Sequence, residues 1–240
     1  MKPLTLAQRA WYAVVRAVIA GFCRVFWRLR VDGAENVPRD EPFILAPVHR
    51  SNIDTPLVCA ITRRPLRYMG KDAMWKYRWS AWFFTSLGGF PVHRGTADRE
   101  AMRSCLEVLA GGEPLVMFPE GTRRTGPIVE SLFDGAAYVS ARAGVPIVPV
   151  GIGGSEAAMR KGARMIRPVK LTLVVGRPLH PEPPGAGRAS RRAVRQLSDR
   201  LAKELQALFD EAQVKAGGPA PGRIGRGRFG RRRMQGTTPP

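Results

Sequence analysis

The segment from Val48 to Asp54, VHRSNID, contains two residue types that can move a proton together. His49 and Asp54 are five positions apart, whereas side chains that meet on a regular helix are three or four apart. The pair therefore meets only if His49 lies in a loop and Asp54 begins a helix. The imidazole would then take a proton at one nitrogen while the carboxylate holds the other. A buried histidine beside a helix-capping aspartate explains the same pair, so this motif alone leaves both interpretations open.

No serine or cysteine in a distinctive nucleophile setting accompanies the pair. Ser51 is close in sequence, but a hydroxyl group of the substrate is the preferred nucleophile. The three cysteines, Cys23, Cys59 and Cys105, occur singly among apolar residues, which is typical of reduced core thiols in a cytoplasmic protein. The three histidines lie far apart in sequence without ligand-like neighbours, so we expect no metal site.

A second polar motif, FPEGTR from Phe118 to Arg123, follows an apolar stretch. Gly121 allows the backbone to approach a ligand closely, and Arg123 offers a bidentate fork that suits phosphate. Glu120 would either tether an arginine or bind substrate hydroxyls, and Thr122 adds a hydroxyl donor. An exposed proline-glycine turn is the alternative interpretation.

Apolar segments that read as strands alternate with helical segments along residues 43–212. The predicted strands are 43–49, 66–71, 88–94, 114–121, 145–152 and 169–179. The intervening helices begin at Asp54 or cover 72–87, 98–112, 133–144 and 190–212. This alternation predicts an α/β fold with a mixed, largely parallel central sheet flanked by helices.

Polar side chains follow four of these strands where each ends, in the order His49 and Asp54, then Lys71, then Arg94, then Glu120 with Arg123. In open α/β sheets, ligands bind beyond the carboxyl ends of the strands. The sequence therefore predicts that these side chains gather at one edge of the sheet.

With these motifs in place, the chain resembles the lysophosphatidic acid acyltransferase family, the 1-acylglycerol-3-phosphate O-acyltransferases within the wider glycerolipid acyltransferases. Four blocks occur in the family's order, HRSNID, GGFPVHR, FPEGTR and VPIVPV, over about residues 40–180. Val48 stands where the family often has asparagine, and Pro91 and His93 interrupt the strand of the second block. These departures bear on the identity of the acceptor and leave the expected type of reaction unchanged.

The resemblance implies transfer of a fatty acyl group from acyl-CoA or acyl carrier protein to the free hydroxyl of a lysophospholipid, with 1-acylglycerol-3-phosphate as the expected acceptor. It implies no cofactor besides this thioester co-substrate. A different lyso-lipid or a glycolipid is the alternative acceptor. By the same resemblance, His49 is the general base and Asp54 orients it. Arg94, Arg123 and Lys71 would bind the acceptor phosphate, while Glu120, Gly121 and Thr122 would shape the acceptor site.

Residues 1–30 read as an amphipathic helix that associates with a membrane. Arg9, Arg16, Arg24 and Arg28 fall within about a third of the helix circumference, and no uncharged run is long enough to span a bilayer. We expect these arginines to face lipid headgroups and the apolar residues Trp11, Phe22 and Trp27 to face acyl chains. The alternative is an amphipathic helix packed on its own domain.

Two further clusters have no assigned chemistry. Trp75, Trp79 and Trp82 recur at helical spacing and would line an acyl pocket, rest at a bilayer interface or pack in the core. The basic residues of the segment 160–167 would face headgroups or CoA phosphates, or form a solvated surface.

The formal net charge of +20 implies an anionic partner. After the acyltransferase domain, residues 31–214, a Gly-, Pro- and Arg-rich segment covers residues 215–240 and reads as a disordered basic tail. We expect a peripheral or monotopic protein on the cytoplasmic face of the cell membrane, bound to an anionic surface, with no specific nucleic acid. A non-catalytic protein that binds anionic membrane or nucleic acid would explain the charge but not the motifs.

Overall fold

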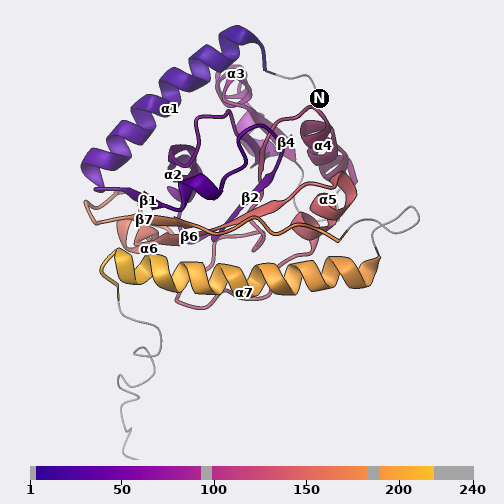
Figure 1. The fold of residues 1–240 in the computed structure, drawn as a ribbon. Helices are drawn as coiled ribbons and strands as arrows, with labels where there is room; N and C mark the ends of the chain where they lie inside the picture. Colours follow the sequence, from indigo (N-terminus) through magenta and orange to yellow (C-terminus); the bar gives the residue numbers. More distant parts are fainter. Residues whose placement is uncertain (1–3, 93–98, 183–189, 219–240) are drawn as a thin grey trace, which may run out of the picture.

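The computed structural model describes residues 4–92, 99–182 and 190–218, and its centre is a sheet of seven strands (Figure 1). The strands lie in the order β1-β7-β6-β2-β5-β3-β4. All neighbouring pairs are parallel except β6 and β7, which are antiparallel. The prediction of a mixed, largely parallel sheet is therefore confirmed. The strands are β1 Arg30–Asp32, β2 Ile44–Pro47, β3 Arg67–Lys71, β4 Gly89–Val92, β5 Leu115–Val116, β6 Ile147–Gly153 and β7 Thr172–Val175.

Helices cover both faces of this sheet (Figure 1). Seven α-helices are described: α1 Leu6–Phe26, α2 Asp54–Leu57, α3 Arg78–Ser86, α4 Arg99–Ala110, α5 Gly135–Ala143, α6 Ser155–Ala158 and α7 Arg191–Lys215. Short 3-10 turns add η1 Ala34–Asn36, η2 Val58–Ala60 and η3 Asp72–Trp75. The helix predicted to begin at Asp54 is thus a short α-turn that continues as η2. The predicted basic tail, residues 215–240, lies outside the described residues from 219 onward.

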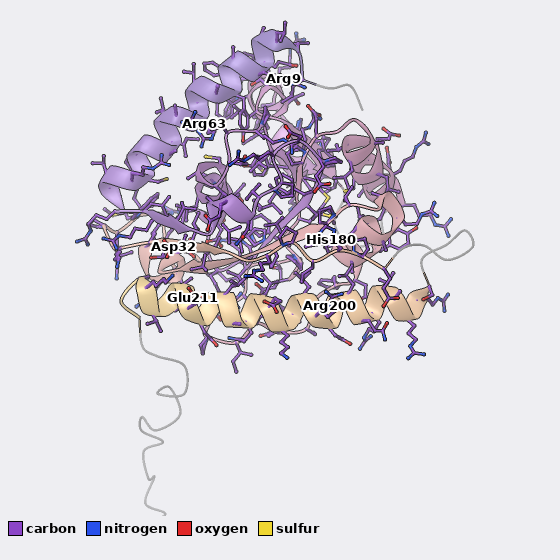
Figure 2. All side chains as sticks on the ribbon, in the orientation of Figure 1. Arg9, Asp32, Arg63, His180, Arg200 and Glu211 are labelled. Carbon is purple, nitrogen blue, oxygen red and sulfur yellow. The ribbon has the colours of Figure 1, made fainter. Side chains whose placement is uncertain are left out.

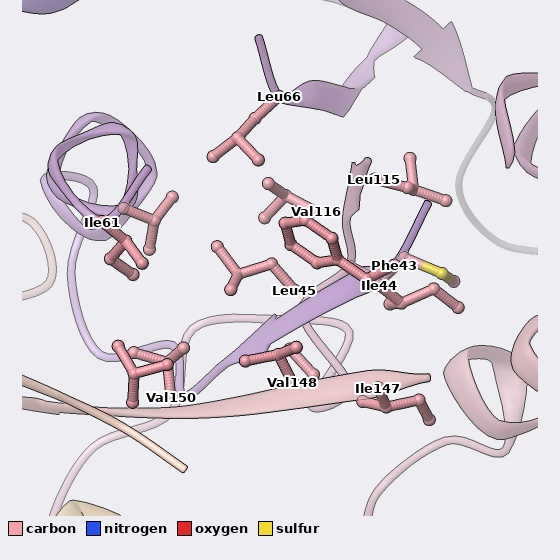
Figure 3. Close-up of a cluster of buried hydrophobic side chains, with 14 of the residues drawn as sticks. Phe43, Ile44, Leu45, Ile61, Leu66, Leu115, Val116, Ile147, Val148 and Val150 are labelled. Atoms are coloured by element: carbon pink, nitrogen blue, oxygen red, sulfur yellow. The ribbon is translucent and has the colours of Figure 1, made fainter. Parts of the chain in front are cut away.

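The core forms where β2 lies between β5 and β6. Every residue of β2 and of β6 is buried, because strands in the middle of a sheet covered on both faces contact other residues on each side. Ile44 and Leu45 of β2 pair with Leu115 and Val116 of β5 and with Ile147 and Val148 of β6. Figure 3 shows their side chains packed with Phe43 and Leu66. The loop after β2, which begins at Val48, therefore leaves from a strand at the centre of the buried core.

Helix α7 lies unusually close to β6. A Cβ atom at Gly151 would lie 2.1 Å from the carbonyl oxygen of Leu208, and one at Gly153 would lie 2.0 Å from that of Ala212. No side chain larger than hydrogen fits at either position. The outward side of α7 carries charged residues such as Arg200 and Glu211 (Figure 2). One face of the sheet is thereby closed by direct contact between helix backbone and strand.

Helix α1 packs on the other half of the molecule, and its predicted orientation is wrong in two respects. Arg16 points inward, where its Nε atom donates to backbone carbonyls of Cys59 and Thr62. Trp27 is 3% exposed, and its indole N–H donates to the carbonyl oxygen of Arg167 at 2.9 Å. The arginines therefore do not share one outward face. The outward face is apolar instead, with exposed Leu6, Val14, Val18, Phe22 and Val25.

The alternative of packing on the domain holds for the opposite face of α1, where Tyr12, Ala20 and Cys23 are buried. No helix among the described residues is both long and apolar enough to cross a bilayer.

The contact between α7 and β6 yields a first prediction. Changing Gly153 to Ala should lower the free energy of unfolding by about 1–3 kcal/mol, because the added methyl group must displace helix backbone. Denaturant-induced unfolding measures this change. Gly21→Ala in α1 is a matched control: no atom lies within 4 Å of its added Cβ, so it should stabilise the protein by about 0.5–1 kcal/mol. Equal effects of the two substitutions would show that α7 can move away from the strand.

Candidate functional site

His49 and Asp54 meet as their spacing predicts. His49 follows β2 in a loop, and Asp54 is the first residue of α2. The imidazole Nδ1 lies 3.0 Å from Asp54 Oδ2. The same carboxylate oxygen accepts the backbone N–H groups of Arg50 and Ser51, both at 2.6 Å. Asp54 therefore both closes the loop and holds the imidazole. It does not cap the helix, because the N-cap of α2 is Ile53 and the N–H groups that Asp54 binds precede the helix.

The imidazole is fixed on one side and open on the other. Its ring stacks on Phe118, with 4.1 Å between ring centroids. Asp54 is fully buried, whereas the His49 side chain is 13% exposed. With Nδ1–H donated to the carboxylate, the lone pair of Nε2 is available to take a proton. This geometry would allow the imidazole to act as a general base held by the carboxylate.

Two nucleophilic side chains near this base, Ser51 and Cys59, are not available to it. Ser51 is buried, and its hydroxyl donates to the carbonyl oxygen of Met159 at 2.8 Å. Cys59 lies near the site, but burial raises the pKa of its thiol to about 12, which leaves it protonated at neutral pH. These two residues therefore do not supply the attacking atom, and the arrangement is compatible with attack by a hydroxyl group of a bound ligand.

A buried ion pair lies behind His49. Arg50 Nη1 donates to both carboxylate oxygens of Glu120, at 2.7 and 2.6 Å, and both side chains are fully buried. Glu120 also accepts the backbone N–H of His49 at 2.9 Å. The prediction that Glu120 tethers an arginine matches this geometry. Its side chain does not reach the acceptor side of His49, however, so a direct contact with substrate does not fit its position.

Arg50 is a site residue to which sequence reasoning assigned no role. Its guanidinium also donates to the carbonyl oxygens of Gly126 and Ile128 and lies over the ring of Phe209 in α7. The sequence did carry a signal for a role of Arg50, because this charged residue directly follows His49 after a continuous apolar run. Its partner lies seventy positions away, which no local pattern indicates.

A cavity of about 590 Å³ opens beside His49, a size typical of sites for organic ligands. Its walls come from α1, α2, η2, β3, η3, α3 and β4 and from the loops after β2 and β5. They are mainly apolar, with Val15, Ile19, Pro56, Met69, Trp75 and Phe84 among them. Arg16, Lys71 and Arg123 also line it, whereas no carboxylate side chain of the described residues does. The cavity therefore suits an amphiphile with an anionic group.

The predicted phosphate-binding residues are placed as follows. Lys71 ends β3 and Arg123 follows β5, so both reach the cavity from the carboxyl edge of the sheet, as does His49. Arg94 lies outside the described residues, and its role stays a prediction. Gly121 has a positive φ of 65°, and the ring of Phe133 occupies the space that a Cβ would need. Gly121 and Thr122 are exposed beside Arg123 and do not line the cavity.

Helix α1 contributes part of the cavity wall, which sequence reasoning did not predict. Tyr12, Val15, Arg16 and Ile19 all line the cavity from its inner face. Of the three tryptophans at helical spacing, Trp75 lines the cavity, whereas Trp79 and Trp82 are exposed. The amphipathic pattern of α1 showed that it has an inner face, but not which cavity that face covers.

Comparison with known proteins adds a family and a related structure. A family model described as Acyltransferase matches residues 28–153, more than half of the chain. A structure of the 1-acyl-sn-glycerophosphate (LPA) acyltransferase from Thermotoga maritima superposes with a TM-score of 0.67 at 25% identity, covering 85% of this chain and 84% of that one.

Curated relatives point in the same direction. A Bacillus subtilis 1-acyl-sn-glycerol-3-phosphate acyltransferase is 28% identical over 63% of this chain and 74% of its own length. A Chlamydomonas reinhardtii protein of the same description is 30% identical over 65% of this chain, but the match spans only 48% of that relative. A Pseudomonas aeruginosa lyso-ornithine lipid O-acyltransferase is 32% identical over 52% of this chain and 47% of its own.

The buried ion pair yields a second prediction. Arg50→Met should lower the free energy of unfolding by about 3–5 kcal/mol, because it leaves the Glu120 carboxylate buried without its cation. Denaturant unfolding measures the loss, and the double variant Arg50→Met, Glu120→Gln should recover part of it. Arg195→Met removes one partner of an exposed pair on α7 and should leave stability unchanged. A stable Arg50→Met protein would contradict the role given to this pair.

Proposed function

Because the chain belongs to the Acyltransferase family, we propose that it transfers a fatty acyl group from a thioester donor to the free hydroxyl of a lysophospholipid, with 1-acylglycerol-3-phosphate as the acceptor. The donor is acyl-CoA or acyl carrier protein. One observation carries the proposal: the His49–Asp54 pair opens onto a mainly apolar cavity that also contains Lys71 and Arg123 and no described carboxylate. A base, an anion-binding pair and an apolar wall are what acyl transfer to a phospholipid requires.

The reaction follows from the position of the imidazole. Nε2 of His49 removes the proton of the acceptor hydroxyl as its oxygen attacks the thioester carbonyl and the new C–O bond forms. Asp54 holds Nδ1–H and stabilises the imidazolium. When the tetrahedral intermediate collapses, the C–S bond breaks and the proton on Nε2 passes to the departing thiolate. The products are the acylated lipid and a free thiol, so His49 returns to its neutral form.

Lys71 and Arg123 would orient the acceptor through its phosphate. They extend from neighbouring strands, because β3 and β5 are paired and parallel. A guanidinium binds two phosphate oxygens at once, and an ammonium adds a point charge. Arg94 is proposed as a third cation on the basis of the motif alone. Glu120 would act through Arg50 and the His49 backbone, whereas Gly121 and Thr122 would shape the loop that presents Arg123.

A different acceptor is the second candidate. The Pseudomonas aeruginosa lyso-ornithine lipid O-acyltransferase matches half of the chain at an identity similar to that of the glycerol-phosphate enzymes. The cations of the cavity favour the phosphate-bearing acceptor, since an anionic headgroup would pair with them.

The surface around α1 supports a membrane-bound enzyme. Val18 is 67% and Val25 is 81% exposed on the outward face of α1. Trp11 of α1 contacts Trp82 of α3 with 6.3 Å between ring centroids, which joins the two helices into one apolar surface, and Figure 1 shows both on the same side of the molecule. We name this surface, formed by the exposed apolar residues of α1 with Trp79 and Trp82, the apolar surface. Aromatic and aliphatic side chains of this kind enter the headgroup region of a bilayer.

Exposed cations border the apolar surface. Arg9 lies near one end of α1, and Arg24 and Arg28 lie at the other. The loop 159–168 adds further exposed cations beside this second end, where Trp27 bonds to Arg167. Such a border favours anionic lipid. We place the protein at the cytoplasmic face of the membrane, because its three described cysteines are free and buried, as in reducing compartments.

The third prediction tests the catalytic pair. His49→Ala should lower acyl transfer by about 10²–10⁴-fold, and Asp54→Asn should cause a loss in the same range by releasing the imidazole. Mass spectrometry would follow products from mixed acceptors, namely 1-acylglycerol-3-phosphate, a lyso-ornithine lipid and a lyso-glycolipid, with acyl-CoA or acyl carrier protein as donor. Phosphatidate should be the main product.

His180→Ala is the control for this experiment, because His180 is exposed and does not line the cavity. Wild-type protein that acylates none of these acceptors would refute the proposed function. Full activity of His49→Ala would refute the role of the base.

The fourth prediction concerns the apolar surface. Val18→Glu combined with Val25→Glu should weaken binding to vesicles that contain phosphatidylglycerol by about tenfold or more, because two apolar side chains no longer enter the bilayer. Vesicle sedimentation measures the affinity. Val214→Glu is the matched control, since Val214 is exposed on α7, on the opposite side of the sheet from α1 (Figure 1). Equal binding by both variants would exclude α1 as the membrane contact.

A further inference from the structure

The cavity contains a charged side chain that the proposed reaction does not use. Arg16 of α1 lines the cavity, and its Nε atom donates to the carbonyl oxygens of Cys59 at 2.9 Å and Thr62 at 2.5 Å. These carbonyls lie at the C-terminal end of η2, where helical carbonyl groups lack partners within the helix and carry partial negative charge. The guanidinium is therefore held in one place.

Arg16 and His49 both line the cavity, and the groups that hold them are separated along the chain. Asp54, which holds His49, begins α2, and the two carbonyls that bind Arg16 come five and eight residues later. At a helical rise of about 1.5–2.0 Å per residue, the backbone at Asp54 and the two carbonyl groups that bind Arg16 are separated by roughly 8–16 Å.

The two ends of β3 also indicate that the cavity extends from His49 toward Arg16. Lys71 ends this strand beside the catalytic end of the cavity, whereas Tyr12 accepts the backbone N–H of Leu66, directly before the strand begins. Tyr12 and Arg16 are one helical turn apart on α1. The cavity thus runs along β3 from the reacting end to the Arg16 end.

The Arg16 end offers hydrogen-bond donors that the described protein does not satisfy. Among the described residues, none accepts a hydrogen bond from the two Nη groups of Arg16. The hydroxyl groups of Tyr12 and Tyr68 face each other at the same end. A plain hydrocarbon end placed here would remove water from the Nη groups of Arg16 and return no acceptor, which is unfavourable. A ligand that carries an oxygen atom at this point would replace the water.

We propose that Arg16 forms a polar subsite that selects the transferred acyl chain by the chemistry of its far end, favouring a chain that carries a hydroxyl group there over a plain chain of equal length. The inference rests on the proposed function, because the acyl carbonyl must lie beside His49 for the chain to run toward Arg16. Its chemistry is that of a site built to bind a substrate hydroxyl, which rejects the analogue that lacks it.

A purely structural role for Arg16 makes a different prediction. If the guanidinium only ties α1 to η2, its loss would weaken transfer of every acyl chain alike. The ratio of two donors measured on the same protein separates these cases, since any general loss of activity or folding cancels.

The experiment uses pairs of acyl-CoA donors, one plain and one hydroxylated at the terminal carbon, over a series of chain lengths with 1-acylglycerol-3-phosphate as acceptor. Competition measured by mass spectrometry gives the ratio of kcat/KM within each pair. At lengths that reach Arg16, wild-type protein should favour the hydroxylated chain, and Arg16→Met should lower that ratio about tenfold or more. Arg16→Lys, which retains a donor and its charge, should keep part of the preference.

Arg24→Met is the matched control, because Arg24 lies on the same helix and is exposed; its ratio should equal that of the wild type. An unchanged ratio in Arg16→Met at every length, or a wild-type preference for plain chains at every length, would overturn the inference. Wild-type protein that transfers neither kind of chain would instead refute the proposed function, so the two failures are distinguishable.

Discussion

The ion pair between Arg50 and Glu120 joins the two loops on which the site is built. Arg50 belongs to the loop after β2 and Glu120 to the loop after β5, so their contact fixes the distance between the base and the segment that contains Arg123. Taking both charges out of water is costly, and the cost is offset only when the remaining donors and acceptors are satisfied. Here Glu120 also accepts the His49 backbone N–H, and Arg50 donates to two further carbonyl groups. The orientation of His49 is therefore tied to the stability of the fold.

Local patterns in the sequence were enough to predict most of the architecture. The apolar segments 43–49 and 145–152 contain most or all of the strands β2 and β6, which can be continuously apolar because both sheet faces are covered. The strand β1, Arg30–Asp32, was not predicted, because three residues flanked by charges carry no periodic signal. The antiparallel pairing of β7 with β6 was also not assigned, since strand direction depends on the path of the chain between them rather than on the residues of either strand.

The site was predictable as far as short-range spacing determines it. The five-residue step between His49 and Asp54 implied a loop followed by a helix, and the structure has that arrangement. The position of Glu120 beneath the base required knowing its partner, Arg50, which is distant in sequence. The error at α1 has a similar cause. Helical periodicity grouped Arg16 with the other arginines, but two carbonyl groups from a different segment decide where its guanidinium lies.

The glycine contacts between β6 and α7 make the two sides of this molecule differ in how well they can accommodate substituted side chains. Where helix backbone touches strand backbone, as at Gly151 and Gly153, a changed side chain has no space to occupy, and no residue of α7 lines the cavity. On the opposite side, much of the cavity wall consists of side chains of α1, η2, η3 and α3 rather than of helix backbone pressed against a strand. A substitution that alters ligand preference therefore has more room on the α1 side of the sheet than at the contact between β6 and α7.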